Sequence, residues 1–149
     1  MNSGNNLYPQ VILHDSYVNK IYYDKRKIVF EFEPYGYYVK SKDKYYGCNK
    51  SKIIFDLKED ESYEIQLKKD ICLFGFVFTM VEDISKEKLK RKLDAGKIDI
   101  EFIYEYYALD SCFYEIMVHE KNVNKWGYLK FEIANIEYEW DKIDCNYPL

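Results

Sequence analysis

The fold of this chain is decided by one stretch, Leu129-Lys130-Phe131-Glu132-Ile133-Ala134-Asn135-Ile136-Glu137-Tyr138-Glu139-Trp140. Apolar and polar residues alternate along it, as they do in a β-strand that buries one face. The apolar positions are odd-numbered up to Ile133 and even-numbered from Ile136. One inserted residue shifts the alternation in this way, so we predict a β-bulge at Ala134-Asn135 within a long, bent strand. A tight turn between two shorter strands is the alternative.

The same alternation recurs along most of the chain. It predicts strands over residues 18–23, 28–32, 53–57, 63–67, 98–106 and 114–118. Short polar segments separate them at 24–27, 59–61, 108–111 and 120–127. Between 34 and 52, aromatic residues stand beside turn-formers, which predicts a loop with part of it pairing as an edge strand.

Two segments depart from this alternation. The run 71–81 is almost entirely apolar, so we predict a buried strand or strand pair there. One helix is expected around residues 85–95, with Ser85 as its N-cap, Leu89 and Leu93 one turn apart, and Gly96 at its C-terminal stop.

The fold class that these elements predict is mainly β, or α+β. We expect an antiparallel sheet or sandwich of about eight strands with one short helix, because strands cluster instead of alternating with helices. Residues 1–149 form a single domain, and residues 1–10 are expected to be a flexible lead. The predicted core comprises Phe30, Phe32, Phe55, Leu67, Phe76, Phe102, Tyr104, Phe131 and Trp140.

The composition limits the class of protein. With 149 residues, 48% of them hydrophobic, the chain is typical of one globular domain. Four widely spaced cysteines and two histidines lack a metal-binding spacing, so we predict no metal site and reduced thiols. The polar start of the chain has no signal-peptide character, and no apolar run approaches the ~20 residues that cross a bilayer. We therefore predict a cytoplasmic protein without a membrane partner.

Charge is distributed unevenly along the chain. From Ile98 to the end there are 11 acidic and 4 basic residues, a net charge of −7, whereas the whole chain carries −4. Phosphate groups would be repelled by this acidic third, which argues against nucleic acid as a partner. The acidic third would suit a basic protein partner. A solvated acidic face that maintains solubility is the alternative.

The residues that could carry catalysis form no convincing set. Histidine stands beside an acid only at His14-Asp15 and His119-Glu120. Sequence neighbours on a strand point to opposite faces, so we expect neither pair to be in direct contact. The acid pairs Glu101/Glu105 and Glu137/Glu139 are expected on solvated strand faces, where nothing shifts a carboxyl pKa. We predict no catalytic residue, no cofactor and no enzymatic activity.

Binding is the better-supported function. The chain contains 17 tyrosines, and tyrosine offers a large contact area with a hydroxyl for hydrogen bonding. We predict a protein-binding surface made of Tyr35, Tyr37, Tyr38, Tyr45, Tyr46, Glu101, Glu105, Glu137 and Glu139. The alternative is that roughly half of the rings between 34 and 47 cap the sheet or cover the core.

The opening of the chain carries a family resemblance. Leu13-His14-Asp15 followed by Val18, and then the strand pattern from Ile21 to Phe32, resembles the start of small bacterial immunity-type proteins. Those proteins are encoded beside polymorphic toxins and protect the producing cell by binding the toxin. The resemblance implies a β-rich binding protein in which His14 and Asp15 are structural or interface residues.

We therefore expect a non-enzymatic immunity-type protein that masks a basic toxin domain with an acidic, tyrosine-rich surface. The alternative is a small-molecule-binding β-barrel or half-barrel, in which inward aromatic side chains line a cavity. A closed cavity of several hundred Å³ would favour this alternative, whereas a filled core would favour the binding protein.

Overall fold

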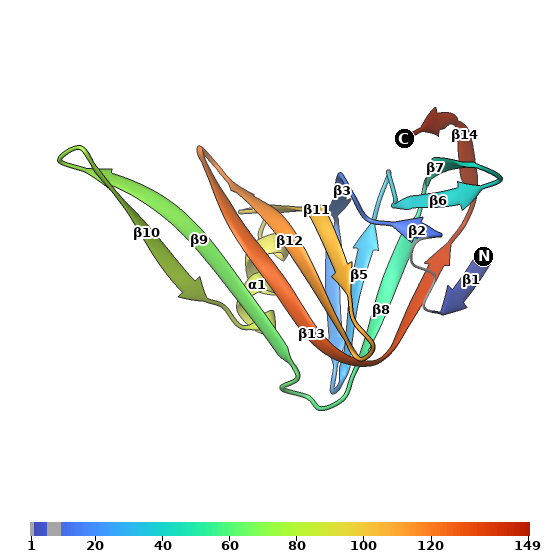
Figure 1. Ribbon diagram of the computed structural model, residues 1–149, viewed down its shortest axis with the longest axis horizontal. Coiled ribbons are helices and arrows are strands. Elements are labelled where there is room, and N and C mark those ends of the chain that lie inside the picture. The colour runs from blue at the N-terminus through green and yellow to red at the C-terminus, as the bar shows by residue number, and fades with distance from the viewer. Residues whose placement is uncertain (1, 6–9) are drawn as a thin grey trace.

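The computed structural model describes residues 2–5 and 10–149 (Figure 1). In this part of the chain, ten strands form one large antiparallel sheet, four form a smaller one, and there is one helix. The strands of the large sheet are β1 (Asn2–Asn5), β3 (Ser16–Val18), β4 (Lys20–Asp24), β5 (Lys27–Phe32), β8 (Ser51–Leu57), β9 (Tyr63–Leu73), β10 (Phe76–Asp83), β11 (Asp99–Tyr107), β12 (Ser111–Glu120) and β13 (Val123–Trp140). The smaller sheet contains β2 (Val11–Ile12), β6 (Tyr38–Ser41), β7 (Lys44–Cys48) and β14 (Ile143–Pro148). The prediction of a mainly antiparallel β protein with one short helix is confirmed.

The large sheet closes on itself. Hydrogen-bonded neighbours follow the order β3-β11-β12-β13-β8-β5-β4. The two ends of this path, β3 and β4, are consecutive pieces of one stretch that is interrupted only at Asn19. There the Asn19 amide donates to the Glu31 carbonyl over 2.8 Å, which keeps the stretch against β5. The path thus returns to its starting segment and encloses an interior.

The long strand β13 turns the sheet. Its first half pairs with β12 and β9, and its second half pairs with β8 and β1. The pairing with β8 shifts register between Ile133 and Asn135, which confirms the predicted β-bulge at this point. Figure 1 shows that β13 is strongly bent, so that one strand serves two parts of the sheet.

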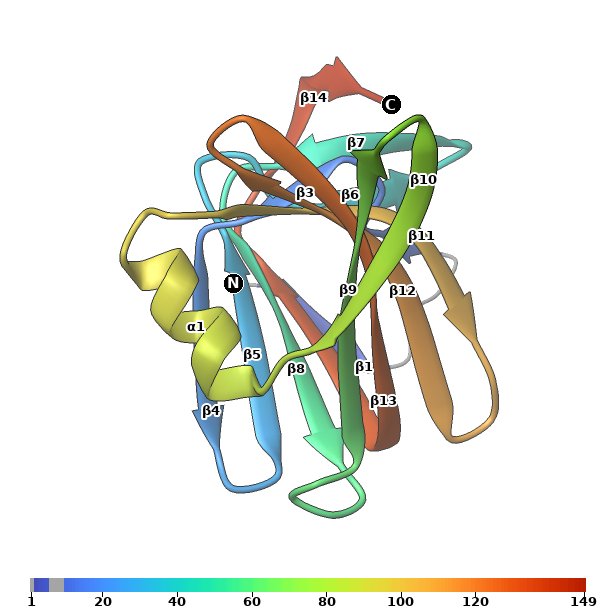
Figure 2. The same ribbon diagram turned by 90° about the vertical axis from the view of Figure 1, so that its left-hand side faces the viewer.

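The helix α1 (Lys86–Asp94) also matches its prediction. The Ser85 hydroxyl accepts a hydrogen bond from the Lys88 amide over 3.2 Å, which satisfies one of the free amides of the first turn. Leu89 and Leu93 are buried, and Gly96 follows the helix with a positive φ of 61°. The helix lies beside β4 at the edge of the body (Figure 2). No helix in the described part of the chain has the length and apolar character to cross a membrane.

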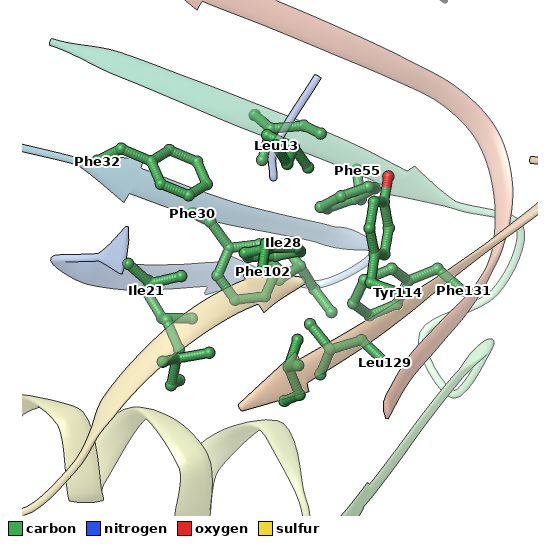
Figure 3. Packing of buried hydrophobic residues seen from close by; sticks show 14 of the residues in the cluster. Leu13, Ile21, Ile28, Phe30, Phe32, Phe55, Phe102, Tyr114, Leu129 and Phe131 are labelled. Atoms are coloured by element: carbon green, nitrogen blue, oxygen red, sulfur yellow. The ribbon is translucent and has the colours of Figure 1, made fainter. Parts of the chain in front are cut away.

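Aromatic rings fill the interior of the closed sheet (Figure 3). The rings of Phe55 and Phe131 lie 4.7 Å apart, and those of Phe102 and Tyr114 lie 5.2 Å apart. Phe30 lies 5.8 Å from both Phe55 and Phe102. These separations are typical of packed aromatic pairs. Six of the predicted core residues are confirmed as buried, namely Phe30, Phe32, Phe55, Leu67, Phe102 and Phe131.

Two predicted core residues are wrong, and a third is half-buried. Tyr104 is exposed because the pairing of β11 with β12 shifts register between Phe102 and Tyr104, so that Ile103 is an inserted residue. Phe76 is exposed because its strand leaves the body of the protein. Trp140 packs against the core without being fully buried.

The remaining differences concern the ends of the chain and the segment 34–52. Residues 2–5 form β1 and pair with β13, where a flexible lead was expected; positions 1 and 6–9 of that lead lie outside the described residues. Within 34–52, β6 and β7 form a hairpin in the smaller sheet, so this segment contains more strand than predicted. Short strands of this kind account for a total above the expected eight.

Candidate functional site

The outer half of the β9–β10 hairpin extends away from the body of the protein (Figure 1). Lys68 is the last residue of β9 that pairs with β13, opposite Trp126. Beyond it, Lys69–Leu73 pairs only with β10 among the described residues. The turn is formed by Phe74 and Gly75, with φ values of 51° and 80°. Two positive φ angles identify a type I′ turn, which matches the twist of a tight hairpin.

One face of this outer half is apolar from Ile71 to the tip and back to Met80, with Lys69 beside Met80 at its inner end. Side chains alternate between the two faces of a strand, and the register pairs Leu73 with Phe76, Ile71 with Phe78, and Lys69 with Met80. We define the docking face as the five apolar residues that share this side, Ile71, Leu73, Phe76, Phe78 and Met80. Leu67 has the same parity and is buried, so the docking face lies on the same side of β9 as the interior, beyond Lys69.

Four of the five residues of the docking face are exposed, and Ile71 is half-buried. Phe76 is 69% exposed, and Phe74 at the tip is 97% exposed. Contiguous exposed apolar surface of this kind marks interaction sites in soluble proteins. The prediction that 71–81 is a strand pair is confirmed, but the prediction that this pair is buried is wrong.

The opposite face of the hairpin is smaller and more polar. The Thr79 hydroxyl donates to the Asp70 carboxylate over 2.6 Å, and these residues are directly opposite each other in the register. Cys72 and Val77 form the next pair toward the tip. The Cys72 thiol is free and exposed. The hairpin is therefore two-sided, with bulky apolar groups on the docking face only.

A second unusual group is the half-buried carboxyl of Glu105. Because Ile103 is an inserted residue, the residues of β11 that follow it exchange faces. Glu105 and Tyr107 therefore point inward. The Tyr107 hydroxyl donates to Glu105 over 2.9 Å and lies 3.1 Å from both the Tyr114 and the Tyr138 hydroxyls. Burial raises the Glu105 pKa to about 7, against the lowering effect of its hydrogen bonds and of His14. The prediction that Glu105 is solvated and unshifted is wrong.

The triplet Leu13-His14-Asp15 is attached to this same part of β11. The Leu13 amide donates to the Glu105 carboxylate over 3.1 Å, and the Asp15 amide donates to the Phe102 carbonyl over 2.8 Å. His14 Nδ1 lies 2.6 Å from the Ile103 carbonyl oxygen, which is only an acceptor, so Nδ1 carries a proton. The triplet thus satisfies backbone and side-chain groups around the inserted residue.

The expectation of no direct contact is wrong for His14-Asp15, whereas His119 and Glu120 have separate partners, Glu120 pairing with Lys92 and Lys125. His14 Nε2 lies 3.3 Å from the Asp15 carboxylate, because the two residues are on a turn where Asp15 has a φ of 58°, and strand alternation does not apply. His119 contacts Glu101 over 2.8 Å and Asn124 over 3.0 Å. Burial lowers the His119 pKa, but its hydrogen bonds to Glu101 and Asn124 outweigh this, so the pKa is raised. These contacts link β11 to the β12–β13 hairpin.

The structure does not gather the nine predicted binding residues into one exposed surface. Tyr37 and Tyr38 are buried, and the Tyr37 hydroxyl donates to the Glu139 carbonyl over 2.8 Å. Tyr35 is exposed, Tyr45 and Tyr46 are half-buried in β7, and Glu101 contacts His119. Glu137 is half-buried in β13, and Glu139 forms an ion pair with Lys52 over 2.9 Å. Tyr37 and Tyr38 fit the alternative, in which roughly half of these rings cap the sheet or cover the core.

Comparison with known proteins gives no further guidance to the site. The chain matches no protein-family model, no curated protein and no solved structure. Among residues 2–5 and 10–149, no three His, Cys, Asp or Glu side chains come together to hold a metal ion.

Sequence reasoning missed the docking face, although one signal was present. Phe74-Gly75 stands near the middle of the apolar run 71–81, with charged residues at both of its ends. A glycine at a two-residue turn indicates a hairpin. The charged residues at both ends of the run indicate that the base of the hairpin is in contact with solvent. The apolar composition of the run, taken alone, predicts a buried strand.

Proposed function

We propose that this chain is a non-enzymatic protein-binding module that docks its partner through the face Ile71, Leu73, Phe76, Phe78 and Met80. The observation that supports the proposal is the continuous apolar surface of a hairpin that extends from a body whose own core is already filled. Burying such side chains against a partner contributes roughly 25 cal/mol per Å² of apolar area. Aromatic residues are also enriched at the centres of protein interfaces.

A narrower form of the proposal is an immunity protein that acts in the cytoplasm and masks a basic toxin domain. The net charge of −7 after residue 97 supports it, since opposite charge accelerates association with a basic partner. The docking face would supply the apolar centre of the interface, and the acidic residues would steer the approach. The Tyr35–Tyr147 pair, whose rings lie 5.8 Å apart, is a further exposed aromatic contact.

Small-molecule binding is the second candidate, and one hollow favours it. A cavity of about 290 Å³ at the bend of β13 is lined by Tyr107, Leu109, Ile133, Ile136 and Tyr138, among others. This volume is at the lower limit of ligand pockets, which are typically about 300–1,000 Å³. The interior itself is filled by aromatic rings, so the protein-binding proposal has the stronger support.

The experiment that tests the proposal is co-expression with the product of the adjacent gene. We expect a stable complex, and relief of any toxicity of that product. The double variant Phe76→Thr/Phe78→Thr should abolish both, because it removes the two largest side chains of the docking face while retaining β-forming residues.

The matched control is Val77→Thr/Val81→Thr, which changes two residues of the same strand on the opposite face. This control should leave the complex intact. Equal binding by both double variants would contradict docking through this face, and hydrolytic turnover by the purified protein would contradict a non-enzymatic function.

A further inference from the structure

We propose that two copies of this chain pair antiparallel along the outer edge of β10, with the two-fold axis at Thr79. Their two hairpins would then form one four-stranded sheet. The pairing rests on the backbone of β10 and does not depend on the proposed function. Its consequence, a docking face built from both copies, goes beyond that function.

The outer edge of β10 presents its backbone groups to solvent. In a type I′ turn, the carbonyl of Leu73 accepts from the amide of Phe76, so the backbone groups of Phe76 point toward β9. Backbone direction alternates along a strand, so the groups of Val77, Thr79 and Val81 point away from β9. Within the described residues, β10 pairs with β9 alone.

This edge lacks the features that normally prevent strand addition. Proteins protect such edges with Pro, Lys or other charges, with bulges, or with short strands. From Phe76 to Val81 the strand has no proline and no charged residue, and its pairing with β9 is in continuous register. A long, uncharged and regular edge is a template for another strand.

The hairpin also has a structural need for further strands. Its outer half contains two strands, Lys69–Leu73 and Phe76–Met80, without a third strand beside them in the described part of the chain. Isolated two-stranded hairpins are marginally stable in water, whereas three or more strands with an apolar face are stable. Two strands from a second copy would meet this requirement.

A second copy fits the edge because the edge is complementary to itself. Residues whose backbone groups point outward must lie opposite residues of the same kind in the second copy. A two-fold axis at Thr79 achieves this for Val77, Thr79 and Val81. Thr79 lies opposite Thr79 of the second copy, and Val77 lies opposite its Val81. Directly opposed Thr and β-branched pairs stabilise antiparallel strands, and self-complementary two-fold contacts are the commonest basis of homodimers.

Charge favours the antiparallel direction. Glu82 and Asp83 end β10 at its base. A parallel arrangement would place these carboxylates beside their own copies, and like charges directly opposite destabilise a sheet. In the antiparallel arrangement, Glu82 lies opposite Phe76 of the second copy, six residues from its own counterpart. The two Glu82 residues are then roughly 20 Å apart, since each residue advances about 3.3 Å, and this exceeds the screening length of ~10 Å in 0.1 M salt.

The pairing would combine the two docking faces. Phe78 would lie opposite Met80 of the second copy on the same side of the new sheet, because residues of equal parity face one another. Each copy would then contribute Phe76, Phe78 and Met80 to one continuous apolar surface. A partner would meet residues of both chains.

The test is the molar mass in solution, measured by light scattering over a range of protein concentrations. We expect a mass of twice the 18.1 kDa of the chain. Val77→Pro/Val81→Pro should halve this mass while the chain stays folded, because proline is tolerated where an amide points away from the sheet. Val77→Thr/Val81→Thr retains both amides and should remain dimeric.

A disulfide trap tests the register independently of folding. In a background with the exposed cysteines removed, Cys72→Ser/Cys145→Ser, Thr79→Cys should give a covalent dimer on oxidation. Directly opposed, hydrogen-bonded residues are about 5.5 Å apart between Cα atoms, which is within disulfide range. Val81→Cys should not crosslink, because its counterpart would be roughly 13 Å away.

Three outcomes would overturn the pairing. These are a monomeric mass up to roughly 100 µM, a dimer that survives both prolines, and crosslinking at Val81 in place of Thr79. A monomer that still loses its partner through Phe76→Thr/Phe78→Thr would overturn the pairing alone and support the proposed function.

Discussion

The half-buried carboxyl of Glu105 gives the sharpest prediction for stability. Its pKa is raised from 4.5 to about 7 in the folded protein, chiefly because burial disfavours the charged form. The folded state therefore binds this proton more tightly than the unfolded state. The stabilisation from Glu105 is complete below pH 4.5 and is lost as the pH rises through 7. The shift corresponds to about 3 kcal/mol between these limits.

The variant Glu105→Gln removes this titration. A glutamine is neutral at every pH and keeps one oxygen that accepts from the Tyr107 hydroxyl or the Leu13 amide. We expect its free energy of unfolding to be close to that of the wild-type protein at pH 4.5. At pH 8 the variant should be more stable by about 1–3 kcal/mol, because no charge is buried. Urea unfolding at several pH values between 4.5 and 8 measures the difference.

The matched control is Glu132→Gln, which changes an exposed carboxylate of β13, two strands away from β11 in the same sheet. Its pH dependence should be parallel to that of the wild-type protein. The reasoning would be refuted if Glu105→Gln and the wild-type protein had the same pH dependence, or if Glu105→Gln were less stable than the wild-type protein at pH 8.

The remaining predictions concern packing and the helix cap, and thermal or urea unfolding measures all three. Phe131→Ala should cost about 3–5 kcal/mol, because its ring is fully buried; a loss below about 1 kcal/mol would contradict its place in the core. Gly127→Ala should destabilise by about 1–3 kcal/mol, since its new carbon would lie 2.4 Å from the Gln66 carbonyl oxygen, and an unchanged stability would refute this close approach. Ser85→Ala should cost about 1 kcal/mol through loss of the cap, whereas Ser85→Asp should retain it.

The bulge in β13 was predictable because it leaves a mark in the sequence. Ile133 and Ile136 are both apolar and lie at positions of opposite parity, so only an inserted residue keeps both on the buried face. The helix was predictable for a similar reason, since Ser85, Leu89 and Gly96 are local signals that tertiary contacts reinforce.

The bulge in β11 leaves no such mark. Tyrosine is compatible with both the interior and the surface, so Tyr104 and Tyr106 continue an apparent apolar alternation past the insertion at Ile103. As a consequence Glu105 points inward, which is unexpected for a charged residue. This orientation can be inferred only when the groups that donate hydrogen bonds to its carboxylate are known. Those groups come from Leu13 and Tyr107, and Leu13 is 92 residues away in the chain.

The exposed apolar hairpin and the inward carboxyl of Glu105 both depart from the usual pattern of apolar residues inside and charged residues outside. They differ in whether the chain itself compensates for the departure, and this difference supports the proposed docking function. Proteins violate such rules mainly at functional or compensated sites. For Glu105 the compensation lies within the chain, because a tyrosine hydroxyl and a backbone amide satisfy its oxygens. For Phe76 and Phe78 the described residues supply no covering group. An exposed apolar face remains costly in water until another surface covers it, so the proposed docking rests on the uncompensated face and not on Glu105.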